Sequence, residues 1–314
     1  MKFSVAGRTH DIIKGSIATL VLFLAYVSLP LAGMVAGLFA PLPAAFYSLK
    51  NDNWTGAAIV AIAAVGLAVV ADPASALLYL LGSAVVSLAL PFFIERGVGG
   101  VRAIVSTAAL NIVLVVAAVI AYGLIQGVDI HAMVQKGIDT SIAQTASLYE
   151  KGGVKGEELE AFQSAMRQAG SLIGRIYPAM LIIGFGCIAG ATLGFLLRLS
   201  ARLPRPIEVG DFKQFKNPEQ LVWVVIVAGF ALLIPNEIAA GTALNILIVT
   251  LTFYCLQGMA VIAFFFNRLA TPTFLRVMFY IFLAVQPYLA VAVTALGIFD
   301  LWGNFRTPKK TGNL

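Results

Sequence analysis

Long apolar segments, separated by short polar breaks, recur along nearly the whole chain. A membrane-spanning helix needs about 20 mostly apolar residues, and nine candidates occur, at residues 12–30, 31–49, 54–71, 74–94, 102–126, 174–198, 219–236, 241–266 and 272–300. Sixty per cent of the 314 residues are hydrophobic and 11% are charged, whereas soluble domains average about 45–50% apolar and about 25% charged residues. So much apolar surface cannot be buried in one soluble core. The sequence therefore predicts an all-α protein, a polytopic transmembrane helix bundle, and excludes a soluble or disordered chain.

The few charged residues lie at the ends of these segments and predict the topology. If the amino terminus is cytoplasmic, basic residues such as Lys50 and Arg198 fall on the cytoplasmic side, as the positive-inside rule requires. The alternation holds over eight segments. A ninth crossing would place the basic tail outside, but Pro272 and Pro287 could break the last segment and return it. Eight and nine membrane segments both stay open, and the net charge of +6 is explained without nucleic acid.

The charge pattern divides the chain into three parts. Residues 1–126 hold about five N-terminal transmembrane helices, and residues 174–314 hold three to four C-terminal ones with a basic cytoplasmic loop at 199–218. Between them, residues 127–173 carry apolar side chains at helical spacing on both sides of a Gly-Gly breaker. This part is expected to form an extracytoplasmic amphipathic helical hairpin. The hairpin either caps the bundle or lies on the membrane surface, or it has a partner-binding or gating role.

Glycines four residues apart predict close helix packing, because small residues let helices approach each other in lipid. The expected packing positions are Gly186, Gly190 and Gly194 in one segment and Gly33 and Gly37 in another. Such stripes indicate a tightly packed bundle, but they do not identify a substrate.

Uncharged polar side chains inside the apolar segments are few, and they are densest in segment 241–266. Thr250, Tyr254 and Gln257 share one helix face there, while Asn245 lies on a second face. A helix that is polar on two faces is expected at the centre of the bundle, because polar side chains are costly in lipid. The candidate substrate-binding residues are Asn245, Tyr254, Gln257, Asn111 and Tyr79. They could line a pocket for a small polar molecule, or they could only form hydrogen bonds between helices, each worth about 0.6–2 kcal/mol.

Motifs for catalysis and metal binding are missing from the sequence. His10 and His131 lie outside the segments, and no HExxH, GxSxG or GxxxxGK[ST] pattern occurs. The carboxylates Asp72, Glu237 and Asp300 lie at segment ends, so none is expected at depth in a span. We therefore expect a protein that is not an enzyme, with no metal site and no cofactor. Without a nucleotide-binding loop, transport would need a partner or a gradient.

Stretches in the last hundred residues carry a resemblance to a known family. The most specific are Leu-Gln-Gly at 256–258 and Gly-Ile-Phe-Asp-Leu-Trp at 297–302, with Asn-Pro-Glu-Gln-Leu-Val-Trp at 217–223. In these the chain resembles the YybS-like family of uncharacterised polytopic bacterial membrane proteins, which is distantly similar to the substrate-binding subunits of energy-coupling-factor transporters. The resemblance implies a multi-pass protein of the bacterial cytoplasmic (inner) membrane, a vitamin-like ligand and a separate ATPase module.

The leading hypothesis is an integral membrane protein that serves as a small-molecule (vitamin-like) substrate-binding or transport subunit and needs a separate energising partner. The alternative is a non-transporting membrane scaffold of the cell envelope, which recruits an envelope protein through its hairpin and basic loop. Both hypotheses place the chain in the lipid bilayer and neither involves nucleic acid.

Overall fold

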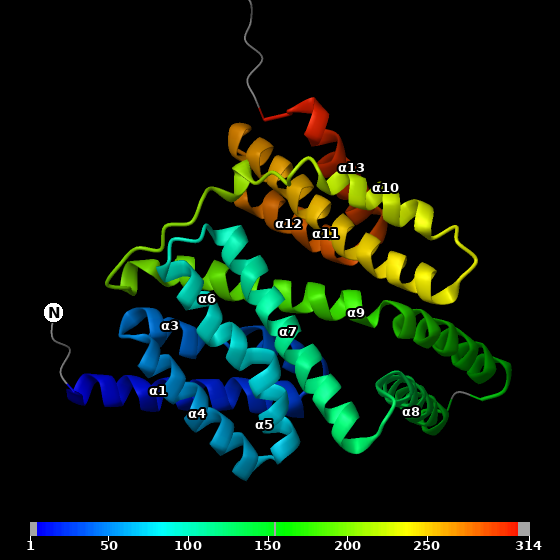
Figure 1. Cartoon of the computed structure of the whole chain (residues 1–314), viewed down its shortest axis with the longest axis horizontal. Helices are drawn as coiled ribbons and strands as arrows, with labels where there is room; N and C mark the ends of the chain where they lie inside the picture. The colour runs from blue at the N-terminus through cyan, green and yellow to red at the C-terminus, as the bar shows by residue number, and fades with distance from the viewer. Residues whose placement is uncertain (1–4, 154, 307–314) are drawn as a thin grey trace, which may run out of the picture. The chain divides into compact units, whose positions relative to one another are not determined.

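Every regular element that the structure describes is a helix (Figure 1). The structure is a computed structural model, and it describes residues 5–153 and 155–306. The prediction of an all-α chain is confirmed. The helices form two units: unit 1 comprises Met1–Met133 and Leu181–Gly210, and unit 2 comprises Val134–Met180 and Asp211–Leu314.

Short polar breaks set where several helices begin and end. Asp52 and Asp72 cap helices by accepting hydrogen bonds from the backbone N–H groups of Thr55 and Ser75. The backbone N–H and the hydroxyl of Ser75 hold the pKa of Asp72 below its usual range. Gly127 ends another helix in the left-handed conformation, at φ 63°, which costs glycine little.

Six helices among the described residues are long and apolar enough to cross a membrane. They are Gly7–Ser28, Asn53–Val70, Pro73–Glu95, Gly100–Gln126, Glu157–Arg202 and Glu237–Arg268. A seventh crossing is counted if Thr273–Val285 and Pro287–Gly303, which are bent by 106° at their junction, form one broken span.

This number is smaller than the eight or nine segments that the sequence predicts, because two apolar segments form only short helices. Segment 31–49 is split at Pro41 into two helices of 10 and 9 residues. Segment 219–236 contributes one helix of 11 residues. At 1.5 Å per residue such a helix is about 16 Å long, roughly half of the hydrocarbon thickness.

Unit 1 contains α1 (Val5–Ser28), α2 (Pro30–Phe39), α3 (Leu42–Lys50), α4 (Asn53–Val70), α5 (Pro73–Tyr79), the π-helix η1 (Leu80–Ala84), α6 (Val85–Glu95), α7 (Gly100–Gln126), the later part of α9 (Glu157–Leu199) and the 3-10 turn η2 (Ser200–Arg202). One apolar cluster includes Phe23, Ile59 and Tyr79. A second joins Leu90 of α6 to Leu196 of α9. The later part of α9 therefore packs with helices that precede residue 126, a grouping that differs from the three parts drawn from the sequence.

Unit 2 contains most of α8 (Ile130–Lys151), the first part of α9, the 3-10 turn η3 (Phe212–Gln214), α10 (Leu221–Ala231), α11 (Glu237–Arg268), α12 (Thr273–Val285) and α13 (Pro287–Gly303). Helix α11 is the central element, since α10, α13 and η3 all pack against it (Figure 1).

The 127–173 region consists of α8 and the start of α9, joined through Gly152 and Gly153. The rings of Tyr149 and Phe162 stack near this turn, with their centroids 4.0 Å apart. Further from the turn, a Cβ on Gly170 would lie 2.6 Å from Ile142 Cδ1. The two helices therefore run antiparallel. The side of the membrane on which they lie stays a prediction.

The glycine stripes differ in the room that each position leaves. A Cβ on Gly33 would lie 2.6 Å from the carbonyl oxygen of Tyr26, and one on Gly37 would lie 2.7 Å from the Tyr26 ring, so both positions need a small residue.

The second stripe leaves room for larger side chains. Among the described residues, a Cβ on Gly186 or Gly194 would meet no atom within 4 Å, and one on Gly190 would meet only Ile104, at 3.8 Å. Within the described part of unit 1, the nearest approach to this stripe is therefore the ordinary van der Waals contact with Ile104 of α7, and its close packing stays a prediction.

Candidate functional site

Two glycines allow α11 and α13 to approach each other backbone to backbone. A Cβ on Gly258 would lie 1.9 Å from the carbonyl oxygen of Val293, and one on Gly297 would lie 1.9 Å from that of Tyr254. No larger residue fits at either position. These glycines belong to the Leu-Gln-Gly and Gly-Ile-Phe-Asp-Leu-Trp stretches, and their contact places the end of α13 beside the middle of α11.

The end of α13 turns back on itself. Asn304 adopts a left-handed conformation, at φ 40°, and its backbone N–H bonds to the carbonyl of Asp300. The next backbone N–H, of Phe305, donates to Asp300 Oδ1 over 3.3 Å. This turn brings Arg306 against the Asp300 carboxylate, and the two form an ion pair.

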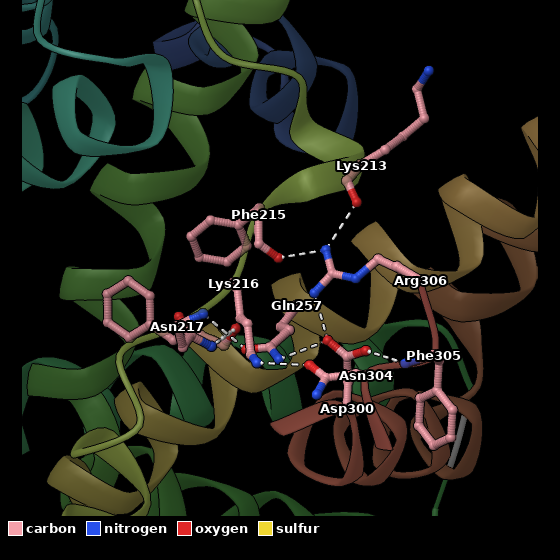
Figure 2. A network of polar contacts seen from close by, with 10 residues as sticks. Lys213, Phe215, Lys216, Asn217, Gln257, Asp300, Asn304, Phe305 and Arg306 are labelled. Atoms are coloured by element: carbon pink, nitrogen blue, oxygen red, sulfur yellow. Dashed lines mark hydrogen bonds and ion pairs between the residues drawn. The ribbon is translucent and has the colours of Figure 1, made fainter. Parts of the chain in front are cut away.

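A buried polar network grows from this ion pair (Figure 2). The Asp300 side chain is only 2% exposed and that of Arg306 is 13% exposed. Gln257 of α11 donates from Nε2 to Asp300 Oδ2 over 3.0 Å, and its Oε1 accepts the backbone N–H of Asn217 at 2.9 Å. A carboxylate and an amide from neighbouring helices are thus joined to the loop that precedes α10.

The same network holds the loop 211–217 in place. Arg306 Nη1 donates to the carbonyl oxygens of Lys213 and Phe215, both at 2.8 Å, and Figure 2 shows the guanidinium between the loop and Asp300. Asn217 Nδ2 donates to the carbonyl oxygen of Phe253 over 2.9 Å. Hydrogen bonds to Gln257 and Phe253 of α11 and to Arg306 after α13 therefore hold this part of the expected basic loop.

A cavity of about 310 Å³ lies beside the network. Its lining includes three cations and one carboxylate: Lys213, Lys216, Arg306 and Asp300. Gln214, Asn304 and Phe264 complete the wall. The lining charge is positive, and its donors are ammonium and guanidinium groups.

Comparison with known proteins places the chain in a family. The profile of the family described as "Predicted membrane protein (DUF2232)" matches residues 17–301. The chain belongs to this family. No curated protein and no solved structure matches it. With its apolar helices, this DUF2232 member is an integral membrane protein of the lipid bilayer, and the matched range includes Asn217, Gln257 and Asp300. The YybS-like resemblance and the similarity to energy-coupling-factor subunits stay predictions.

Two of the predicted site residues lie next to the network in this DUF2232 member. Gln257 is fully buried and belongs to the network itself. Tyr254 is fully buried one turn earlier, and its hydroxyl has no hydrogen-bond partner among the described residues. On the same face, Thr250 donates to the carbonyl of Ile246 in its own helix.

Asn245 has a different place, at a break in the hydrogen bonds of α9. Its Oδ1 accepts the backbone N–H of Ala179 at 2.8 Å, and its Nδ2 donates to the carbonyl oxygen of Arg175 over 2.7 Å. In an unbroken helix these two backbone groups would bond to each other. Pro178 lies between them, and the amide inserts where the helix ladder opens. Asn245 therefore joins α11 to α9.

Tyr79 and Asn111 lie in unit 1, around the π-helix. Asn111 Nδ2 donates to the carbonyl oxygen of Gly82 over 3.1 Å, and the Tyr79 ring packs against Phe23 with centroids 5.3 Å apart. Asn111 Oδ1 and the Tyr79 hydroxyl are buried without a partner among the described residues. The structure therefore places two of the five predicted residues in unit 1 and three in unit 2.

Sequence reasoning missed Asn217, Arg306 and the burial of Asp300. Asp300 does lie at the end of its helix, as expected, but its carboxylate is buried against Gln257. The signal was a carboxylate within a run of large apolar residues, in the stretch that carried the family resemblance, with an arginine six positions later.

Proposed function

We propose that this membrane protein is a small-molecule-binding subunit, with its ligand in the unit 2 cavity. The observation that carries the proposal is the convergence of polar groups from η3, the loop that follows it, α13 and the turn after α13 on one cavity of about 310 Å³. Ligand pockets usually measure about 300–1,000 Å³ and hold a small number of placed polar groups.

Stability alone is a weak reason for such a network. Removing a carboxylate and a guanidinium from water costs free energy that their attraction barely returns, so apolar residues of similar size often stabilise a fold as well or better. Because such a pair adds little stability, a binding role is the better explanation for it. Lys216 supports this interpretation, since its ammonium group lines the cavity and bonds only to the side chain of Asn304 among the described residues.

We propose binding without catalysis at this site. The one carboxylate in the cavity lining is held by Arg306, Gln257 and a backbone N–H, so it is poorly placed to act as a general base. If the protein takes part in transport, a separate ATPase module would supply the energy. That role and the vitamin-like ligand rest on the family resemblance.

The scaffold alternative is favoured by a different observation. Leu148 of α8 and Leu172 of α9 are 66% and 53% exposed on the two helices of the 127–173 region, so a partner or the membrane surface could cover them. The basic loop contributes less to this alternative, because Arg306 and Gln257 hold part of it.

Native mass spectrometry of the gently purified full chain tests the proposal. We expect a non-lipid small molecule in complex with the wild type, and less of it with Lys216→Gln than with Lys155→Gln, which removes an exposed charge outside the cavity in the same unit. A chain that carries no small molecule under any gentle condition would contradict the proposal. An envelope protein that is lost when residues 131–170 are deleted would favour the scaffold instead.

A further inference from the structure

We propose that the ligand group held in the unit 2 cavity is a phosphate, carried by a soluble molecule or by a lipid headgroup. This inference rests on the proposed function and names its ligand class. The first argument is charge. Three cations and one carboxylate line the cavity, which leaves two positive charges in excess. A phosphate monoester carries about −1.5 to −2 at pH 7, so it would match that excess, whereas a single carboxylate would not.

The second argument is that Arg306 is fixed and still has donors to offer. Three of its guanidinium N–H groups bond to the carbonyls of Lys213 and Phe215 and to Asp300. A guanidinium has five N–H groups, so two have no partner among the residues that the structure describes. A planar guanidinium that is already oriented binds phosphate with little loss of side-chain freedom.

The two lysines add donors that a ligand can recruit. Lys216 Nζ is bonded to the neutral Oδ1 of Asn304 at 3.0 Å. Lys213 Nζ lies 3.4 Å from Asp211 Oδ2, in a pair whose side chains are 36% and 45% exposed, and exposed pairs of this kind contribute little stability. Both ammonium groups can therefore turn to a phosphate at small cost.

Asp300 would then serve as the internal counter-ion of the site. Its carboxylate holds the guanidinium in place, and Gln257 and the Phe305 N–H hold the carboxylate. The guanidinium of Arg306 therefore stays in place beside the cavity before a ligand arrives. Basic pockets between membrane helices also bind anionic lipid headgroups, so the phosphate could come from a lipid as well as from solution.

Thermal unfolding of the full chain in nanodiscs tests the inference and separates the two sources. One arm uses phosphatidylcholine nanodiscs with added glycerol 3-phosphate, compared with chloride at equal ionic strength. The other uses nanodiscs that contain phosphatidic acid, whose headgroup is a phosphate monoester, with no soluble phosphate. We expect a rise in Tm in at least one arm, and the responding arm identifies the source.

Lys216→Gln should weaken that response by about tenfold to a hundredfold in phosphate concentration, since it removes a hydrogen bond between a charged donor and the phosphate. Lys155→Gln should respond like the wild type. Lys216 is exposed and bonds only to a side chain among the described residues, so its variant should fold; if its Tm without phosphate falls, Lys213→Gln replaces it.

No response in either arm, or equal responses of Lys216→Gln and Lys155→Gln, would overturn the inference. A neutral small molecule that co-purifies with a chain insensitive to phosphate would overturn only the phosphate assignment and leave the proposed function standing. A rise in Tm in the lipid arm alone, without any co-purified non-lipid small molecule, would keep the phosphate assignment and overturn the soluble ligand of the proposed function.

Discussion

Unit 1 and unit 2 both bury polar side chains, but they satisfy them in different ways. In unit 2 the buried carboxylate of Asp300 has a guanidinium, an amide and a backbone N–H as partners, and the Tyr254 hydroxyl is the one buried side-chain polar atom there without a partner among the described residues. In unit 1 the buried hydroxyls of Tyr79 and Thr107 and the Oδ1 of Asn111 have no partner among the described residues. Native proteins rarely leave buried polar atoms unpaired without a reason.

The difference shows what each arrangement can do. Unit 2 holds charged groups in fixed positions beside a cavity, as recognition of a charged ligand requires. Unit 1 places neutral polar atoms around a π-helix, a rare feature that often marks functional positions. Four substitutions test this comparison.

The largest effect is expected from Asp300→Ala. The change leaves the Arg306 guanidinium, 13% exposed, without its carboxylate, and breaking a buried pair in this way costs about 3–5 kcal/mol. The free energy of unfolding in detergent, from chemical denaturation, measures the loss. A loss of less than about 1 kcal/mol in the free energy of unfolding would show that water reaches the ion pair and that the network adds little stability.

A nearly equal effect is expected from Gly297→Ala. The new Cβ would lie 1.9 Å from the backbone oxygen of Tyr254, and overpacking against atoms that cannot move aside costs about 3 kcal/mol. Gly241→Ala is the matched control in α11, because its Cβ would meet no atom within 4 Å among the described residues. The stability of this variant should rise by up to about 1 kcal/mol, since alanine favours the helix more than glycine does. Equal thermal stabilities of the two variants would refute the close approach of α11 and α13.

Asn245→Ala should have an intermediate effect. It leaves the Ala179 N–H and the Arg175 carbonyl without their partner, at about 1–3 kcal/mol. Thr252→Val is the control, since in the described part of the chain the Thr252 hydroxyl bonds only within its own helix, to the carbonyl of Ile248. Unfolding midpoints that do not separate the two variants would mean that Asn245 does not join α11 to α9.

The smallest effect, and the one of opposite sign, is expected from Tyr79→Phe in unit 1. The change removes a buried hydroxyl that has no partner among the described residues, so stability should stay level or rise by about 1 kcal/mol. Differential scanning calorimetry detects either outcome. A clear loss would show that the Tyr79 hydroxyl is satisfied after all, and unit 1 would then resemble unit 2.

Much of the helical order could be predicted from the sequence, because apolar length and polar breaks are local signals. Segments 54–71 and 102–126 correspond closely to α4 (Asn53–Val70) and α7 (Gly100–Gln126). Hydropathy could not show that segment 31–49 forms two helices, since two short apolar helices in a row look the same in a hydropathy profile as one long apolar helix. The break at Pro287 was anticipated from the proline, but its 106° angle depends on tertiary packing.

The site was only partly predictable, because its parts are joined over long sequence distances. Gln257 stood out as an amide in an apolar helix. Asn217 and Arg306 lie in polar stretches, where such residues are ordinary, and only the folded loop and the turn after α13 bring them to Gln257 and Asp300. Helix periodicity also could not tell that Asn245 faces the opened ladder at Pro178.

The double variant Asp300→Asn with Arg306→Gln tests the central claim that the unit 2 network exists to hold a charged site and not chiefly to stabilise the fold. The double variant removes both charges together, so its Tm should lie close to that of the wild type and far above that of Asp300→Ala. The decisive measurement is the phosphate dependence of its Tm, in whichever nanodisc arm the wild type responds. The account predicts a folded protein that has lost the response. A folded double variant that responds as the wild type does would contradict it.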